Sequence, residues 1–314
     1  MTLAPYVRIV AQGKGRARSM DQQEAREAMS LMLSGEAEAE AIGALLMVLR
    51  LRGETDAEIA GFTAALRQSV TLTLPKADLD WPCYAAGRTR GAPMFLLSAK
   101  LVAEAGYTVL LHGWNARQNS ADGLPAMLEN LGILGGGLHY EPLDALSLRA
   151  LELLQLRDTF GLRSCINTIL RMWNPSGANA SVQGVFHPSY RGLQSRAGVL
   201  LGDKNLTVIK GGGGEFERNP SKPIEVFGLQ NGNDLNLTAP ALITNARRLH
   251  DPDHPVNLTE LCAGKSNDPF AVATITGTAA LALWSLGAAP DFETSQRLAE
   301  QLWHDRKAKW GKIV

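Results

Sequence analysis

The fold of this 314-residue chain is decided by the stretch Leu206-Thr-Val-Ile-Lys-Gly-Gly-Gly-Gly-Glu-Phe-Glu-Arg-Asn-Pro-Ser-Lys222. It opens with a short apolar run rich in β-branched residues, which is typical of a buried parallel strand. Four glycines follow, and such a run leaves backbone N–H groups open to a ligand. Ligands in open α/β sheets bind at the carboxyl ends of strands. The sequence therefore predicts a binding loop here, with a glycine-rich surface loop as the plain alternative.

Charge is unevenly distributed along a chain whose formal net charge is zero. Residues 1–18 carry four bases and no acid, and residues 19–66 carry nine acids against three bases. Residues 157–222 carry nine bases against four acids. The neutral total argues against general attraction of the whole molecule to nucleic acid or membrane, but it leaves room for an acidic lobe and a basic face.

The composition predicts a soluble protein with a sizeable core. Apolar residues make up 45% of the chain, which argues against extensive disorder. No apolar run approaches the roughly 18 residues of a membrane span, and the first residues lack the pattern of a secretory signal. The three cysteines are far apart and form no disulfide framework. We expect a cytoplasmic protein with no membrane partner.

Residues 1–75 are expected to form a small helical lobe that follows a basic, extended arm over residues 1–18. Ser19 and Asp21 are good N-cap candidates for the first helix. Thr55 and Glu58 have the spacing of a capping box at the start of the third. Three short helices joined by tight turns pack as a small bundle. The expected helices cover residues 20–33, 36–51 and 56–68.

Residues 76–314 show the alternating strand and helix order of an α/β domain. This order implies a mainly parallel sheet with right-handed crossovers. The expected strands cover residues 83–87, 108–112, 206–209 and 223–227. The expected helices cover residues 95–105, 122–131, 145–156, 165–173, 274–286 and 292–303.

Several motifs resemble the anthranilate phosphoribosyltransferase family. Residues 45–60 are similar to the family's N-terminal domain, and Gly161, Arg163 and Asn167 fit a Gly-x-Arg-x-x-x-Asn motif. His112-Gly113, the helix at residues 128–132 and the helix at residues 279–282 also fit. The resemblance covers essentially the whole chain. It implies a nucleoside phosphorylase and phosphoribosyltransferase type of fold, with helices near residues 150–173 packed on the helical lobe, and a homodimer formed through that lobe.

Three motifs that the family's chemistry needs are altered. The family's reaction joins anthranilate to phosphoribosyl pyrophosphate with magnesium. Its Gly-Thr-Gly-Gly-Asp turn is replaced here by Gly-Arg-Thr-Arg-Gly at residues 87–91, and its Asn-x-Ser-Thr by Pro-Met-Phe-Leu at residues 93–96. Its metal-binding Asp-Glu aligns with Phe216-Glu217, so one oxygen ligand is lost. In addition to these three, the Gly-Pro of its substrate loop is replaced by Leu170-Arg171.

These changes resemble a second branch of the family that keeps the fold and the dimer but binds nucleic acid. They predict a protein without anthranilate phosphoribosyltransferase activity, catalytic residues, metal or cofactor, which binds single-stranded DNA or RNA regardless of sequence. Cations would contact the phosphates, and Trp114 or Phe216 would stack on bases. The predicted nucleic-acid site comprises Arg88, Arg90, Trp114, Arg117, Arg171, Lys210, Gly211, Gly212, Gly213, Gly214, Arg218 and Lys222.

Two alternatives remain open. One is a glycosyltransferase or phosphoribosyltransferase with an altered substrate, which would use magnesium. The other is a structural or regulatory dimer that binds a small phosphorylated ligand. The residues that keep the transferase alternative open are His112, Gly113, Asn115, Arg163 and Glu217.

Overall fold

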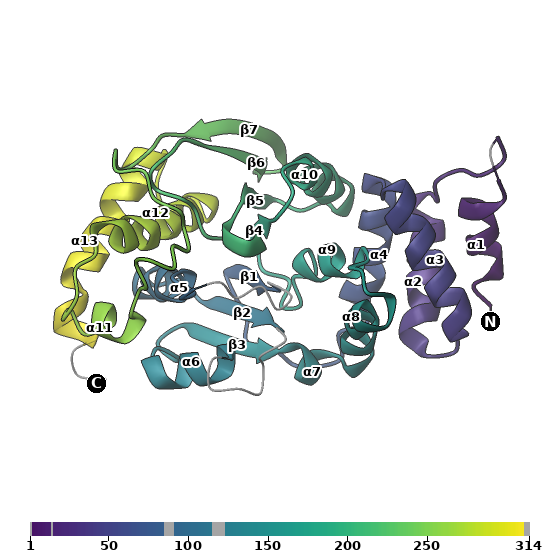
Figure 1. Ribbon diagram of the computed structural model, residues 1–314, viewed down its shortest axis with the longest axis horizontal. Helices are drawn as coiled ribbons and strands as arrows, with labels where there is room; N and C mark the ends of the chain where they lie inside the picture. The colour runs from purple at the N-terminus through teal and green to yellow at the C-terminus, as the bar shows by residue number, and fades with distance from the viewer. Residues whose placement is uncertain (1, 14, 85–90, 115–122, 311–314) are drawn as a thin grey trace.

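The computed structural model describes residues 2–13, 15–84, 91–114 and 123–310, without the side chains of residues 307–309. A helical lobe that carries the N-terminus lies on one side of a central sheet, and the last two long helices lie on the other (Figure 1). The predicted fold class, a helical lobe joined to a mainly parallel α/β domain, is confirmed. None of the helices in the described residues is long and apolar enough to cross a membrane.

The lobe is built from helices of both the N-terminal region and the middle of the chain. They share one apolar core that includes Met29, Leu46 and Phe62 from the first helices and Leu153 and Ile169 from the later ones. The three helices predicted within residues 20–68 are present, with ends shifted by a few residues at most. The lobe helices are α1 (Ala4–Ala11), α2 (Gln22–Ser34), α3 (Ala39–Arg52), α4 (Asp56–Gln68), α7 (Leu143–Leu146), α8 (Leu148–Phe160) and α9 (Ile166–Arg171).

The N-terminal segment is more ordered than the predicted extended arm. Its helix α1 begins with Pro5 in the first turn, where a proline is well tolerated. Leu3 and Val10 are buried against the rest of the lobe. The Arg18 N–H then donates to the Ile9 carbonyl (3.0 Å), which folds the chain back along the helix. The prediction failed because α1 has no side-chain cap and few buried positions.

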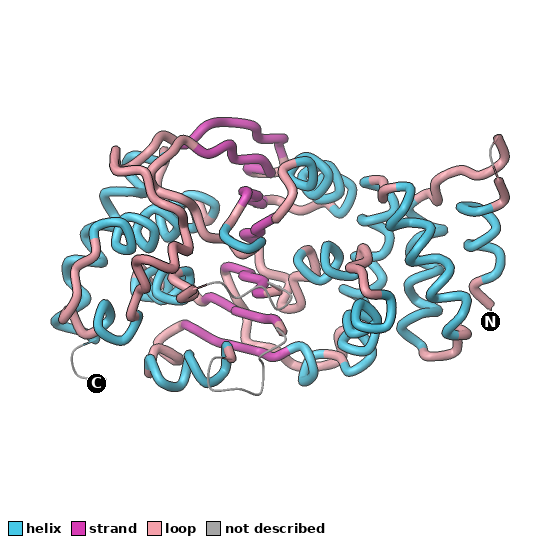
Figure 2. The backbone as a smooth tube through the Cα atoms, viewed as in Figure 1, coloured by secondary structure: helices cyan, strands magenta, loops and turns pink. Residues whose placement is uncertain are grey.

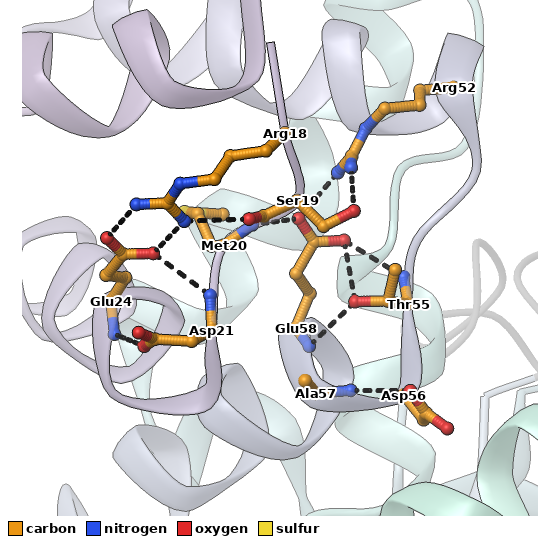
Figure 3. A network of polar contacts seen from close by, with 10 residues as sticks. All are labelled: Arg18, Ser19, Met20, Asp21, Glu24, Arg52, Thr55, Asp56, Ala57 and Glu58. Carbon is orange, nitrogen blue, oxygen red and sulfur yellow. Dashed lines mark hydrogen bonds and ion pairs between the residues drawn. The ribbon is translucent and has the colours of Figure 1, made fainter. Parts of the chain in front are cut away.

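Two polar clusters fix the turns between the lobe helices (Figure 3). Asp21 and Glu24 form one capping box at α2, and Thr55 and Glu58 form the predicted one at α4. Glu58 is buried, and its carboxylate also accepts from the Met20 N–H (2.9 Å). These contacts join the segment before α2 to the start of α4.

In the described part of the chain the sheet has seven strands in the order β3-β2-β1-β4-β5-β6-β7, which are labelled in Figure 1 and drawn in magenta in Figure 2. The first five in this order are parallel, and β6 and β7 are antiparallel. The chain moves outward through β2 and β3 on one side of β1 and through β4 and β5 on the other. The boundary between β1 and β4 is therefore the switch point at which α/β sheets bind ligands. The strands are β1 (Leu79–Cys83), β2 (Val109–Gly113), β3 (Leu138–Pro142), β4 (Ala180–Val185), β5 (Asn205–Lys210), β6 (Ile224–Gln230) and β7 (Asn233–Ala239).

The first strand lies earlier than the predicted residues 83–87. It contains Pro82, and a proline normally argues against a central strand. Pairing with β2 continues over all five residues, but pairing with β4 is confined to Leu79 and Asp80. The Pro82 nitrogen faces β4 and carries no hydrogen, so the ladder ends there. The ladder at the switch point is therefore shorter than the ladders on either side of it.

Helices cover both faces of the sheet. The helices α5, α12 and α13 pack on the face that includes Trp81, Val182 and Ile209. On the opposite face, α10 lies over Val208 and Leu229, between the sheet and the lobe (Figure 1). These helices and the remaining short ones are α5 (Phe95–Glu104), α6 (Leu124–Leu131), α10 (Ser189–Leu201), α11 (Leu258–Cys262), α12 (Pro269–Ser285) and α13 (Phe292–Trp310).

Candidate active site at the carboxyl ends of the central strands

The glycine run after β5 is folded against its own chain. The Gly211 N–H donates to the Val185 carbonyl (3.1 Å), and the Gly212 N–H donates to the Glu217 carbonyl (3.1 Å). The Gly214 N–H donates back to Gly211 (3.4 Å). Three of the four N–H groups are therefore used internally. The expectation that the whole run presents its N–H groups to a ligand is wrong.

Glycine is needed here for a tight turn. Gly213 and Gly214 have φ angles of 64° and 99°, which residues with a side chain rarely adopt. The backbone of Glu215 also presses on β4, because a Cβ on Gly184 would lie 2.1 Å from the Glu215 carbonyl. The glycines thus allow residues 215–217 to pass directly beneath the strand ends.

A cleft of about 840 Å³ opens beside this turn. Its walls are the turn itself, the loop that leads into β6 and the loop before α11. Arg191 and Arg247 form ion pairs with Glu225 (2.5 Å) and Asp268 (2.7 Å). Lys210, Lys222 and Arg248 are exposed at the cleft. The basic residues that line the cleft are Arg191, Lys210, Lys222, Arg247 and Arg248.

Glu217 stands at the inner wall of the cleft and caps a helix of another segment. Its Oε2 accepts from the Phe95 N–H (2.9 Å), the first residue of α5. Its Oε1 lies 3.2 Å from His250 Nε2, without the alignment of a hydrogen bond. A carboxylate at a helix N-terminus is favoured by the helix dipole. Here the protein's own carboxylate occupies a position that could otherwise hold a ligand anion.

The residues around Glu217 do not build a magnesium site. A hard cation needs several oxygen ligands. Phe216 is fully buried and packs edge-on against Trp81 (5.4 Å between ring centroids), so it supplies none. Within the described residues, no group of three His, Cys, Asp or Glu side chains could hold a metal. The predicted absence of a metal stays a prediction, and no step of the chemistry is assigned to one.

A second, smaller pocket of about 80 Å³ lies between α9, α10 and the end of β4. Arg171 is buried, and its Nη2 donates to the Tyr84 carbonyl (2.9 Å). Burial lowers the pKa of Arg171, although Glu215 opposes this shift. Arg171 Nε, Asn167 Nδ2 and Gln194 Oε1 are buried without a hydrogen-bond partner among the described residues. Two donors and one acceptor on residues that line the pocket are therefore unpaired, although these atoms themselves are covered from solvent.

The glycine turn joins the two hollows. Gly211 and Gly212 line the larger cleft. Two residues further on, Gly214 faces Arg171, since a Cβ there would lie 3.0 Å from Arg171 Nη2. The cleft and the small pocket therefore lie on either side of one turn, at the carboxyl ends of β4 and β5.

A polar network is buried beneath the site. The Tyr84 hydroxyl lies 2.9 Å from His112 Nδ1, and His112 Nε2 lies 3.0 Å from Asp80 Oδ1, without the alignment of a hydrogen bond. The second Asp80 oxygen accepts from Ser181 (3.0 Å). Burial, and then the nearby Asp80, raise the pKa of Tyr84 well above its ordinary value. The network ties β1, β2 and β4 together and holds the chain at the point where it leaves β1.

The predicted site residues fall in several places. Lys210, Lys222 and Glu217 meet at the cleft, whereas Arg171 belongs to the small pocket with Arg163. Arg218 is buried and donates to the Pro240 carbonyl (2.6 Å), and it lines neither the cleft nor the small pocket. The predicted residues Arg88, Arg90, Asn115 and Arg117 lie outside the described residues.

The predicted stacking residues are also placed differently. The buried ring of Phe216 cannot stack on a base. Trp114 is half-buried beside the lobe core, with the Arg157 guanidinium 5.1 Å from its ring centroid. His112 is buried, and Gly113 ends β2 with its backbone packed on Cys83.

Sequence reasoning missed several residues of the site. Arg247 and Arg248 reach the cleft from a loop with no recognisable motif, and His250 follows them. Asp80 was missed because the first strand was placed too late. Gln194 lies within α10, where nothing in its spacing indicates a pocket.

The fold, a helical lobe joined to a mainly parallel α/β domain with two hollows at its strand ends, is that of a protein class shown by its relatives. Residues 5–70 match the family described as "Glycosyl transferase family, helical bundle domain". The chain is 30% identical over 318 residues to the anthranilate phosphoribosyltransferase of Moorella thermoacetica, covering 90% of this chain and 89% of that protein. It is 31% identical over 245 residues to the anthranilate phosphoribosyltransferase of Symbiobacterium thermophilum, covering 72% of this chain and 69% of that protein. The chain belongs to the anthranilate phosphoribosyltransferase family.

Solved structures share this fold at low sequence identity. The crystal structure of anthranilate phosphoribosyltransferase from Thermus thermophilus superposes with a TM-score of 0.74 at 23% identity, covering 94% of this chain and 96% of that one. The structure of anthranilate phosphoribosyltransferase from Saccharomyces cerevisiae in complex with PRPP and Mg superposes with a TM-score of 0.74 at 14% identity, covering 99% of this chain and 96% of that one.

These relatives contradict the main functional prediction. Proteins similar over most of the chain are named as phosphoribosyltransferases, which supports the transferase alternative and not sequence-independent nucleic-acid binding. The burial of Phe216 agrees with this correction, because its ring has no exposed face on which a base could stack.

Proposed function

We propose that this protein is a pentosyltransferase that takes a phosphorylated pentose donor and a nitrogen-containing acceptor, with substrates altered from those of its relatives. The observation that carries the proposal is the pair of hollows on either side of the glycine turn. One is wide and lined with cations, and the other is small and lined with unpaired hydrogen-bonding groups.

The cleft suits the phosphorylated end of the donor. Lys210, Lys222 and Arg248 are exposed there and are free to approach phosphate oxygens. Because Glu217 already occupies the N-terminus of α5, the donor's phosphates would bind to these side chains and not to that helix. The altered residues 93–96 agree, since none of them carries a hydroxyl.

The small pocket suits the acceptor. Arg171 and Asn167 hold unpaired N–H groups under the pocket lining, which a carboxylate or carbonyl of the acceptor would pair with if the lining side chains shift to admit it. Gln194 provides an unpaired oxygen, which suits an N–H group. In the reaction, the acceptor nitrogen forms a bond to C1 of the pentose as the bond from C1 to the pyrophosphate oxygen breaks. Pyrophosphate leaves with that electron pair, and the proton lost by the nitrogen passes to solvent. The cations at the cleft would stabilise the charge that develops on the leaving group.

The experiment is ³¹P NMR of phosphoribosyl pyrophosphate incubated with the protein, with and without magnesium. The acceptors would be anthranilate, other aromatic amino acids and nucleobases, each tested separately. We expect release of pyrophosphate that depends on one class of acceptor and is lost in a Lys210→Ala/Lys222→Ala variant. Absence of release with every acceptor, together with absence of saturable donor binding, would contradict the proposal.

The homodimer and the cytoplasmic location stay proposals. Exposed leucines on the lobe support an interface there, since Leu51 is 91% exposed on α3 and Leu148 is 68% exposed on α8. Sedimentation equilibrium of the wild type and a Leu51→Glu/Leu148→Glu variant would test the dimer.

A further inference from the structure

A third hollow, of about 660 Å³, shares no lining residue with the two hollows of the candidate active site. It lies between α12, the first turns of α13 and the segment that follows β7. Most of its floor is apolar and includes Leu242, Leu281 and Phe292. A cavity of this size is in the range that holds a small organic ligand.

One charged group reaches this hollow from the protein interior. The Arg218 side chain is only 3% exposed, and its Nη2 donates to the Pro240 carbonyl (2.6 Å). Its Nε is buried without an acceptor among the described residues. Burial lowers the pKa of Arg218 to about 10, and no neighbouring carboxylate offsets this. A buried cation without a counter-ion is costly, so an anion supplied by a ligand would stabilise it.

The acidic groups around the hollow are engaged elsewhere. Asp291 caps α13 by accepting from the Thr294 N–H (2.7 Å). Glu293 pairs with Arg297 (2.8 Å). Glu300 accepts from the Gln296 amide (2.8 Å). None of these carboxylates forms an ion pair with Arg218 among the described residues.

These charges also limit what the hollow can accept. Asp291, Glu293 and Glu300 face it from α13 and its first turn, with Arg297 as the only cation beside Arg218 in the described lining. A ligand with two or three negative charges would be repelled at this rim. A single carboxylate that passes the rim would reach the guanidinium. The apolar floor would then cover the rest of the molecule.

We propose that this hollow is a binding site for a monocarboxylate with an apolar body, with its carboxylate on Arg218 and its body against Leu281 and Phe292. Nη2 donates to Pro240 and Nε lies against α12 at Gly277, so the carboxylate would accept a charge-assisted N–H bond from Nη1. The site is independent of the transferase chemistry proposed above, since it lies on other residues and requires no phosphate.

Isothermal titration calorimetry with octanoate as the probe tests this site. We expect saturable binding at one site per chain for octanoate. Octanamide has the same body without the charge, and we expect it to bind at least about 10-fold more weakly. Equal affinity for the two compounds, or no saturable binding of octanoate, would overturn the proposal.

Variants locate the site. Arg218→Met keeps the apolar stem and removes the charge, so octanoate affinity should fall at least about 10-fold. Leu242→Trp fills the hollow from a half-exposed position and leaves Arg218 in place, so it should abolish binding. Lys265→Met removes an exposed cation elsewhere and should bind like the wild type.

Circular dichroism melting first establishes that each variant is folded. If Arg218→Met does not fold, Leu242→Trp and the octanamide comparison decide the question. Unchanged octanoate binding in a folded Arg218→Met or Leu242→Trp variant would place the ligand elsewhere and overturn the proposal.

Discussion

Glu58 in the helical lobe and Glu217 at the edge of the sheet are both buried at the N-terminus of a helix, but their surroundings differ. Glu58 accepts from Thr55 three residues away, and from Met20 and Arg52 of the same lobe (Figure 3). Both of its oxygens are satisfied locally. Glu217 reaches Phe95, 122 residues away, and leaves Oε1 without a hydrogen bond beside the cleft.

The difference separates a carboxylate that builds the fold from one that borders a site. A satisfied buried network stabilises and specifies its surroundings, whereas an unsatisfied buried group is costly unless a ligand or water completes it. The small pocket borders both regions: Arg171 and Asn167 on the lobe helix α9, and Gln194 on α10, also hold buried polar atoms without a hydrogen-bond partner among the described residues. We therefore expect substitutions in the lobe to change stability and substitutions at the sheet edge to change ligand binding.

The largest effect on stability is expected for Glu58→Ala. The change removes the acceptor of the Met20 and Thr55 N–H groups and leaves Arg52 without its carboxylate partner. The free energy of unfolding should fall by about 3 kcal/mol in urea titrations, because one partner of a buried pair is lost. Glu38→Ala is the control, since Glu38 stands at the start of α3 without a capping bond, and it should change stability by less than about 0.5 kcal/mol. Equal losses of unfolding free energy in the two variants would contradict the account of Glu58 as a carboxylate that stabilises the lobe.

Glu217→Gln should have a smaller effect on stability and a visible one on binding. Weakening the cap of α5 should cost about 1 kcal/mol. Removing a negative charge from the cleft wall should raise the affinity for pyrophosphate by about threefold or more, measured by calorimetry without magnesium. A fall in affinity would show that the carboxylate itself holds the ligand, contrary to its placement as a helix cap.

Tyr84→Phe tests the buried network under the site. The change removes the hydroxyl that lies 2.9 Å from His112 Nδ1, so the free energy of unfolding should fall by about 1 kcal/mol. Tyr107→Phe, on a half-buried tyrosine before β2, is the matched control. If both variants unfold at the same urea concentration, the network does not stabilise the strand ends.

The smallest effect is expected for the exposed pair of Arg18 and Glu24. The hydrogen bond from Arg18 is the main cause that lowers the pKa of Glu24 from 4.5 to about 2. The folded-state pKa is depressed, so the pair stabilises the protein above about pH 4.5 and loses its effect as the pH falls toward 2. In Arg18→Ala, the Glu24 carboxyl carbon should titrate closer to 4.5 by NMR. An unchanged midpoint near 2 would show that the cap of α2 alone holds the charge.

Local signals made most of the lobe predictable. The capping box of Thr55 and Glu58 lies within four residues, so its sequence pattern contains the whole interaction. The fold class followed from the order of elements and from the family resemblance. The prediction placed the first strand too late because Pro82 argues against a central strand. The proline fits because the pairing of β1 with β4 ends before it, and β4 lies about 100 residues further along the chain.

The candidate site was less predictable because its contacts join distant segments. Lys210 and Lys222 were found from the glycine stretch, but nothing near Arg248 or His250 in the sequence shows that their loop returns to it. Nor does a sequence show that Arg218, four residues after the last glycine, faces the opposite way into another hollow. A basic residue near a motif can therefore be a ligand contact or a buried structural group.

Calorimetric titration of phosphoribosyl pyrophosphate into the wild type, Lys210→Ala/Lys222→Ala and the control Lys204→Ala is the most direct test of the cleft. Lys204 is an exposed lysine at the opposite end of β5. We expect saturable binding to the wild type and the control, and affinity reduced at least about 10-fold in the double variant, since two charge-assisted contacts are lost. Unchanged affinity in the double variant, or no binding to the wild type, would contradict a phosphorylated donor in this cleft.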